Sequence, residues 1–87
     1  MIKIKEGYIL REVAGSNIVV PVGKLDFDGV ITLNETGVMI WKILQKGADK
    51  EEIIKAITSE YDISTEIASK DFDAFLLKLR KANLIDE

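Results

Sequence analysis

ITLNETGVMIWKIL, residues 31–44, is the stretch that decides the fold. The apolar run from Val30 to Leu33 predicts a short strand that ends at Asn34. Asparagine is a favoured N-cap, because its side-chain oxygen accepts a hydrogen bond from an unpaired N–H in the first helical turn. The helix that follows is apolar around most of its circumference, so we expect it to be the central helix of a small core, with Trp41 buried. Gly37 in its first turn costs about 1 kcal/mol relative to alanine, which indicates a close backbone approach at this position.

The composition limits the classes of function that the chain can serve. Its 87 residues fit one domain, residues 1–87, and 47% of them are apolar, which is typical of a globular protein. Cysteine and histidine are both absent, which excludes a disulfide framework, a thiolate nucleophile, and the usual general base and metal ligand. No other catalytic constellation replaces them. We therefore expect a protein that is not an enzyme and that uses neither a metal nor another cofactor.

The net charge and the apolar runs indicate which partners the protein can bind and in which compartment it is expected. The formal net charge is −3, whereas a nucleic-acid binder of this size is expected to carry a basic face. No apolar run approaches the roughly 20 residues of a membrane span, and residues 1–6 lack the apolar segment of a signal peptide. We therefore expect a cytoplasmic protein that binds neither nucleic acid nor a membrane.

The residues before the central helix predict an antiparallel sheet. Gly15-Ser16 is a two-residue hairpin signal, with glycine supplying the positive φ, between the strands Tyr8–Ala14 and Asn17–Val22. Asp28-Gly29 predicts a turn into the third strand, Val30–Leu33, and the acidic residues around this turn lack the spacing of a calcium loop. Residues 1–7 are expected to form a frayed end or a short edge segment.

Capping residues predict the first two helices. Gly47 takes the C′ position of the helix that begins after Asn34, where glycine is common. Asp49 begins the second helix and forms a capping box with Glu52 three residues later. The sequence therefore predicts a short connection between these two helices.

The third helix is expected from the cap Ser64 to about Ala82, with Asn83 in the left-handed C′ position and Leu84 closing on Leu79. Its inward face is predicted to contain Ala68, Phe72, Phe75, Leu76 and Leu79. Leu77 lies opposite this face, and the side chains that project around it are Lys70, Asp73, Ala74, Arg80 and Lys81. Three short antiparallel strands followed by three helices predict an α+β fold, a small winged helix-turn-helix-like domain with the sheet as the wing.

Several short motifs, taken in their order and spacing, resemble the PqqD-like family. They extend from about Tyr8 to Ile85 and are Val20–Gly23, Ile31–Gly37, Ile40-Trp41, Tyr61–Ile63, Asp71-Phe72, Phe75-Leu76, Leu79 and Leu84-Ile85. Members of this family are recognition elements for ribosomally made, modified peptides, and the founding type assists synthesis of the cofactor pyrroloquinoline quinone (PQQ). The resemblance implies a non-catalytic chaperone that holds the leader segment of a precursor peptide for a modifying enzyme, often a radical SAM enzyme. The pathway could be that of PQQ or of another peptide.

The resemblance also implies a binding site, in which the leader adds as a strand beside the third strand and rests against the third helix. Such an edge offers unpaired backbone groups for strand addition. Leu77 and Ala74 would form a pocket for a peptide side chain, and the basic residues nearby favour an acidic leader. The expected peptide-binding residues are Val30, Ile31, Thr32, Leu33, Lys70, Asp73, Ala74, Leu77, Arg80 and Lys81.

Two other functions stay open at this point. One is a winged-helix DNA-binding protein, whose recognition helix would contact bases through its N-terminal residues. That half of the third helix carries Glu66, Asp71 and Asp73 against one lysine, Lys70, so carboxylates would face the phosphates. The other is a structural or adaptor dimer that uses the same sheet edge, and the sequence leaves the oligomeric state open.

Overall fold

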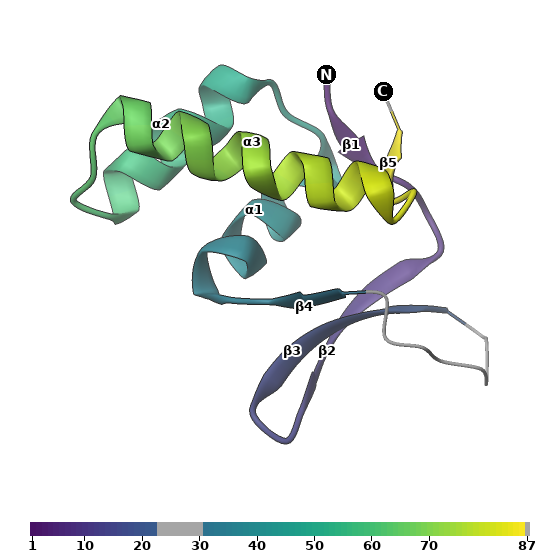
Figure 1. Cartoon of the computed structure of the whole chain (residues 1–87). Helices are drawn as coiled ribbons and strands as arrows, with labels where there is room; N and C mark the ends of the chain where they lie inside the picture. Colours follow the sequence, from purple (N-terminus) through teal and green to yellow (C-terminus); the bar gives the residue numbers. More distant parts are fainter. Residues whose placement is uncertain (23–30, 87) are drawn as a thin grey trace.

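The computed structural model describes residues 1–22 and 31–86 of the chain. The elements in this part are β1 (Lys3–Ile4), β2 (Tyr8–Val13), β3 (Ser16–Pro21), β4 (Ile31–Leu33), α1 (Glu35–Lys46), α2 (Lys50–Glu60), α3 (Thr65–Lys81) and β5 (Ile85–Asp86). Strands β2, β3 and β4 form an antiparallel sheet in that order, and β1 pairs with β5 in a second sheet. Figure 1 shows the larger sheet below the helices, with α1 between the sheet and the pair α2 and α3. The predicted α+β fold is confirmed.

The hairpin of β2 and β3 confirms both predicted strands to within a residue but has a different turn. Val13 pairs with Ser16, so the two loop residues are Ala14 and Gly15. Both have positive φ, 51° at Ala14 and 84° at Gly15, as a type I′ turn requires. The predicted turn at Gly15-Ser16 is wrong, because glycine takes the second central position here and not the first. The turn predicted at Asp28-Gly29 lies outside the described residues.

The predicted caps set the beginning of α1 and α2. Asn34 Oδ1 accepts a hydrogen bond from the Gly37 N–H at 2.8 Å. Gly47 ends α1 with a φ of 92°. Asp49 precedes α2, and Glu52 Oε1 accepts from the Asp49 N–H at 3.3 Å, one half of the predicted capping box. Local side-chain chemistry therefore determines where these two helices begin.

Both ends of α3 agree with the prediction as well. At its beginning, Ser64 Oγ accepts from the Ile67 N–H at 3.2 Å. At its end, Asn83 has a φ of 60°, and the Leu84 N–H donates to the Leu79 carbonyl at 2.9 Å. This is the long hydrogen bond of a Schellman motif. The motif ends the helix and directs Leu84 into the core, where it is fully buried.

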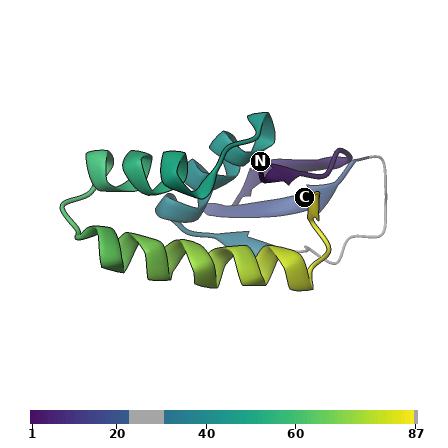
Figure 2. The same ribbon diagram turned by 90° about the horizontal axis from the view of Figure 1, so that it is seen from above.

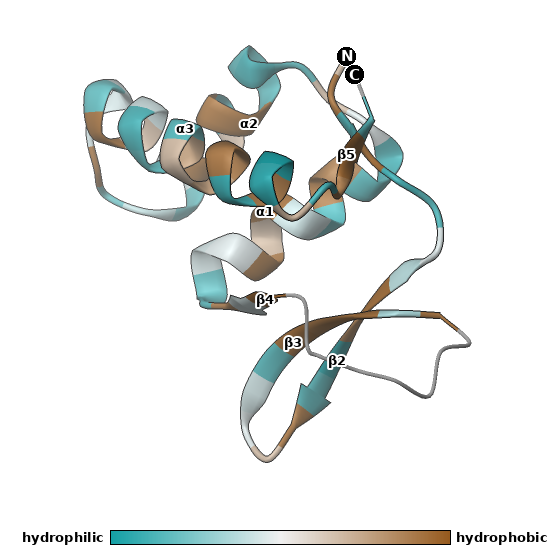
Figure 3. Ribbon diagram, turned by 45° about the vertical axis from the view of Figure 1, so that its right-hand side comes forward, coloured by the Kyte–Doolittle hydropathy of each residue, from teal (hydrophilic) through white to brown (hydrophobic). Residues whose placement is uncertain are grey.

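The core lies between the larger sheet and the helices, around α1. Trp41 and Leu44 are 0% exposed, which confirms the central helix and the buried tryptophan. The predicted inward face of α3 is buried except at Phe75, which is partly exposed. Val19 and Leu33 join the core from the sheet. Figure 3 shows how β3 changes from polar near the hairpin turn to apolar further along, where it packs on this core.

The first residues pair with the last ones in a small second sheet. Lys3 pairs with Asp86 and Ile4 with Ile85, so of the two expectations for residues 1–7 the short edge segment is formed and the frayed end is not. Ile2 also exchanges backbone hydrogen bonds with Ala48, at 2.8 and 2.9 Å. The two ends of the chain therefore lie close together beside the helices (Figure 1).

Candidate functional site

The outer edge of β4 is the first part of the candidate site. In the order β2-β3-β4, β4 has β3 on one side, and its other edge pairs with no strand of the described residues. Its pairing with β3 is antiparallel and covers all three of its residues. This confirms the prediction that the third strand of the larger sheet has an open edge.

The hairpin shows which backbone groups of β3 point toward β4. In a two-residue hairpin, the residues that flank the loop exchange hydrogen bonds, and the bonding direction then alternates along each strand. Ile18 therefore bonds toward β2. The Val22 N–H follows the same alternation, since it donates to the Gly7 carbonyl at 2.8 Å. Asn17 and Val19 consequently bond toward β4.

The same alternation directs the backbone of Thr32 to the open edge. The β4 partners of Asn17 and Val19 are Leu33 and Ile31, so these two residues bond to β3. Thr32 lies between them, and its N–H and C=O therefore point away from the sheet. The Thr32 residue is exposed, whereas Leu33 is 5% exposed and belongs to the core. This edge offers a donor and an acceptor that an added strand can pair with.

Helix α3 lies beside this edge (Figure 2), and two adjoining cavities separate them. We call the two cavities together the β4–α3 groove. The first, of about 320 Å³, is lined by Thr32, Leu33, Asn34, Phe75 and Lys78. The second, of about 250 Å³, is lined by Asn34, Thr36, Gly37, Ile40, Asp71, Ala74 and Phe75. Asn34 and Phe75 line both cavities, so the groove follows β4 into the first turns of α1.

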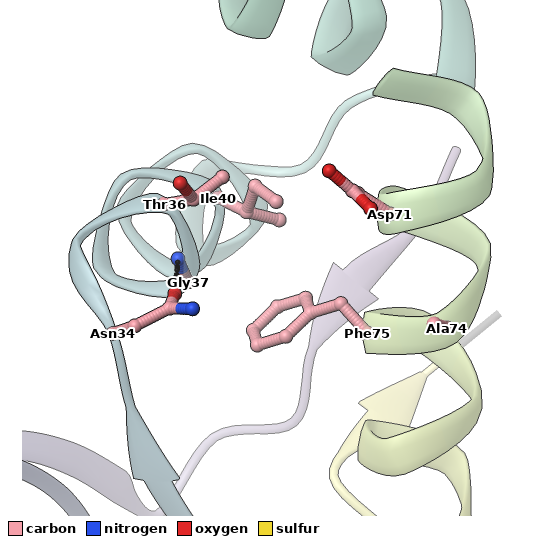
Figure 4. Close-up of a pocket in the computed structure, with 7 residues that line it drawn as sticks. All are labelled: Asn34, Thr36, Gly37, Ile40, Asp71, Ala74 and Phe75. Atoms are coloured by element: carbon pink, nitrogen blue, oxygen red, sulfur yellow. Dashed lines mark hydrogen bonds between the residues drawn. The ribbon is translucent and has the colours of Figure 1, made fainter. Parts of the chain in front are cut away.

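Phe75 forms the apolar wall that the two cavities share. Figure 4 shows its ring pointing from α3 toward Asn34 and Gly37. A Cβ on residue 37 would lie 3.2 Å from Phe75 Cε1 and 3.3 Å from Leu33 Cβ, closer than the optimal separation of two carbon atoms. Gly37 therefore makes room for the ring. This confirms the interpretation of Gly37 as a position of close approach.

The two charged side chains of the groove lie at its opposite ends. Asp71 lines the cavity beside α1, and Lys78 lines the cavity beside β4. They are seven residues apart in α3, which places them on one flank of the helix, roughly 10 Å apart along its axis. Figure 4 shows the Asp71 carboxylate directed toward α1. The groove therefore has a negative end and a positive end.

The structure places part of the predicted site in the groove. Thr32, Leu33 and Ala74 line the cavities, and Ile31 belongs to the same strand. Val30 lies outside the described residues.

The other predicted residues of α3 lie outside the two linings. Asp73 forms an ion pair with Lys50 of α2 at 2.9 Å, so it is directed toward that helix. Leu77 is 51% exposed and shares neither cavity with Ala74. The basic residues that were expected to attract an acidic leader are on the exposed surface and also line neither cavity; they are Lys70, Arg80 and Lys81.

Sequence reasoning missed most of the groove lining. Helical phase gave an inward and an outward face for α3, and Phe75 was assigned to the inward one. The residues missed on α3 are Asp71, Phe75 and Lys78, and those missed around the start of α1 are Asn34, Thr36, Gly37 and Ile40. The i, i+4, i+7 spacing of the three α3 residues marks one flank of the helix. That signal becomes useful only when the position of β4 is known.

The groove can bind an extended chain through backbone pairing, apolar contact and charge. The described residues contain no group of three acidic side chains placed to hold a metal ion. None of the helices in that part of the chain is long and apolar enough to cross a lipid bilayer.

Comparisons with known proteins agree on the fold. Residues 22–85 match the family described as coenzyme PQQ synthesis protein D (PqqD). No curated protein matches the chain. A structure described as TbiB1 in complex with the TbiA(beta) leader peptide is 24% identical, with a TM-score of 0.76 over 97% of this chain and 94% of the other. A lasso peptide synthetase B1 complexed with the leader peptide is 16% identical, with a TM-score of 0.76 over 99% and 98%.

Proposed function

The chain belongs to the PqqD family, and from this premise we propose that it binds the leader segment of a ribosomally made precursor peptide. Residues 1–87 then act as one peptide-recognition domain, not itself an enzyme, in the cytoplasm. The domain presents the peptide to a modifying enzyme, such as a radical SAM enzyme, in the synthesis of PQQ or of another peptide. Both similar structures contain a leader peptide, which supports the proposal.

The observation that carries this proposal is the open edge of β4 beside the groove. Backbone groups of Thr32 point to that edge, and the partly exposed ring of Phe75 lines the space next to it. A peptide added to β4 as a strand would pair with Thr32 and place alternate side chains against α3. Backbone pairing supplies affinity with little sequence preference, so the α3 side chains supply selectivity.

The predicted site residues take different parts in this proposal. Thr32 pairs with the peptide backbone, a pairing that Val30, directly before β4, would extend. Ile31 and Leu33 bond to β3 and keep this edge in place, and Ala74 contacts a peptide side chain. The exposed residues of α3 beside the groove contact the peptide where it extends past the cavities; these are Lys70, Leu77, Arg80 and Lys81. Asp73 contributes through its ion pair with Lys50, which links α3 to α2.

The charge of α3 argues against the DNA-binding alternative. Its N-terminal half carries the exposed carboxylates Glu66, Asp71 and Asp73, and the phosphates of a duplex would repel this acidic half, in which, within the described residues, Asp73 alone is paired with a lysine. Dimerisation through the β4 edge is the other competing function. It would occupy the same backbone groups of Thr32, so it can be tested in the same experiment.

The proposal is tested by an NMR titration of the ¹⁵N-labelled chain with the leader of a precursor peptide encoded beside its gene. We expect shifts at Thr32, Leu33, Ala74, Phe75 and Lys78. The hairpin turn and the outer face of α2 serve as internal controls, and their signals should stay in place. Shifts confined to those controls would remove this site. Concentration-dependent shifts at β4 without peptide would favour the dimer instead.

A further inference from the structure

We propose that the β4–α3 groove selects its peptide by the order of two charges: a basic residue beside Asp71, followed along the peptide by an acidic residue beside Lys78. This inference rests on the proposed function, since it names the kind of leader segment that the groove accepts. It replaces the expectation of an acidic leader with a segment that carries both charges in a fixed order.

The two linings give the groove a direction. Lys78 shares a cavity with Thr32 of β4, whereas Asp71 shares one with Thr36 and Ile40 of α1. Because β4 leads into α1, the groove passes from Lys78 to Asp71 in the direction of β4. The strand pairs of the described residues are antiparallel, and antiparallel pairing is slightly more stable per residue. A peptide strand added to β4 therefore runs from Asp71 to Lys78.

The spacing of the charges predicts a peptide pattern. Asp71 and Lys78 are roughly 10 Å apart along the helix axis, and an extended strand rises about 3.4 Å per residue. Because side chains alternate between the two faces of a strand, residues on the α3 side recur at every second position. Phe75 lies between the two charges along α3. Positions on the α3 side lie about 7 Å or about 14 Å apart along the strand, and only the larger spacing leaves a position between the charges for a contact with Phe75; the lengths of the charged side chains cover the difference of about 3 Å. The predicted segment therefore has a basic residue, an apolar residue two positions later and an acidic residue four positions later.

Reversing this order should weaken binding measurably. Asp71 and Lys78 are exposed, and one exposed ion pair changes affinity by roughly 1.5- to 5-fold. A peptide with its two charges exchanged turns both attractions into repulsions. We expect it to bind at least about threefold more weakly at low salt, and the difference should shrink in 0.5 M salt, where the Debye length is roughly 4 Å.

The test is a selection of random 12-residue peptides, displayed in a library, on the immobilised full chain. The parent should enrich peptides with the basic residue before the acidic one. Asp71→Lys combined with Lys78→Asp keeps the net charge and should enrich the reverse order. Lys42→Asp combined with Glu60→Lys is the matched control, because both residues are exposed and line neither cavity of the groove. This control should enrich the parental order.

Enriched peptides and their charge-exchanged versions are then compared by fluorescence anisotropy, and their sites are located by NMR. Peptides that shift β4 and α3 signals but show no charge order would overturn this inference and leave the proposed function standing. A double variant of Asp71 and Lys78 that keeps the parental preference would do the same. A selection without enriched peptides, or with peptides that bind elsewhere, would count against the proposed function and this inference together.

Discussion

Replacing Thr32 by proline tests the role of the β4 edge in peptide binding without disturbing the fold. The Thr32 N–H points away from β3, so proline removes no hydrogen bond of the sheet. Proline is tolerated on edge strands when its nitrogen faces away from the neighbouring strand, and the residue before it prefers an extended conformation, which Ile31 already has in β4. We therefore expect Thr32→Pro to change the free energy of unfolding by no more than about 1 kcal/mol.

The same substitution should strongly weaken leader binding. It removes one backbone hydrogen bond to the peptide, a net contribution of about 0.5–1.5 kcal/mol. The proline ring also occupies the space through which the peptide carbonyl would approach, so the neighbouring contacts along the strand are weakened too. We expect the dissociation constant to rise at least tenfold, which corresponds to about 1.4 kcal/mol.

The assay is isothermal titration of the leader peptide into the parent, Thr32→Pro and Thr32→Val. Valine keeps the backbone N–H and a similar shape, so it should bind within about threefold of the parent, a difference near 0.6 kcal/mol. Urea unfolding of each variant checks the fold. A folded Thr32→Pro variant with parental affinity would refute backbone pairing at this edge. An equal loss in Thr32→Val would assign the effect to the side chain.

Three further substitutions test the packing. Trp41→Ala should lower the free energy of unfolding by about 3–5 kcal/mol, because Trp41 is 0% exposed; a urea midpoint near that of the parent would contradict this. Gly37→Ala should show no net gain in unfolding free energy and weaker leader binding, because its Cβ would press on Phe75. A gain of about 1 kcal/mol, the full helix-propensity difference, would mean that the ring moves away freely. Lys50→Ala should cost less than about 1 kcal/mol in thermal unfolding, because its ion pair with Asp73 is about half exposed.

The helix boundaries could be predicted from the sequence because their signals are local. Asn34, Asp49 and Ser64 each satisfy an N–H or begin a capping box within the first helical turn. The left-handed conformation of Asn83 is likewise a local signal, because asparagine tolerates this conformation at the C′ position of a helix. A cap needs no information about distant residues, so it can be read before the fold is known.

Sequence reasoning missed two features. One is a pairing between segments far apart in the chain, and the other is the position of glycine within the hairpin turn. A short edge segment at β1 was one of the two expectations, but its partner β5 has only two residues and lies at the opposite end of the chain, so no local signal predicts their pairing. In the hairpin, Ala14 adopts a positive φ that alanine disfavours. A local reading therefore places Gly15 first in the turn, whereas the pairing of six residues along each strand fixes it second.

To predict the groove one must know which side of α3 faces β4, and the hydrophobic periodicity of the helix does not contain this information. A helical wheel gives the direction of the core and the direction opposite to it, and this is why Leu77 was singled out. It does not state which of the two flanks faces β4. The structure places Asp71, Phe75 and Lys78 on that flank, about a quarter turn from the outward residues. The sequence could therefore indicate the two elements that border the groove, but not which side of α3 lines it.

The size of the open edge determines where selectivity must reside. Within the described residues, β4 directs only the N–H and C=O of Thr32 outward, and two backbone hydrogen bonds contribute a net of about 1–3 kcal/mol. Micromolar binding requires about 8 kcal/mol, so most of the affinity must come from contacts with the groove. In the proposed complex those contacts would come from the groove lining, in which the α3 residues are Asp71, Ala74, Phe75 and Lys78. If the proposed function is correct, a change of peptide preference would therefore need substitutions in this lining and none in the backbone pairing of β4.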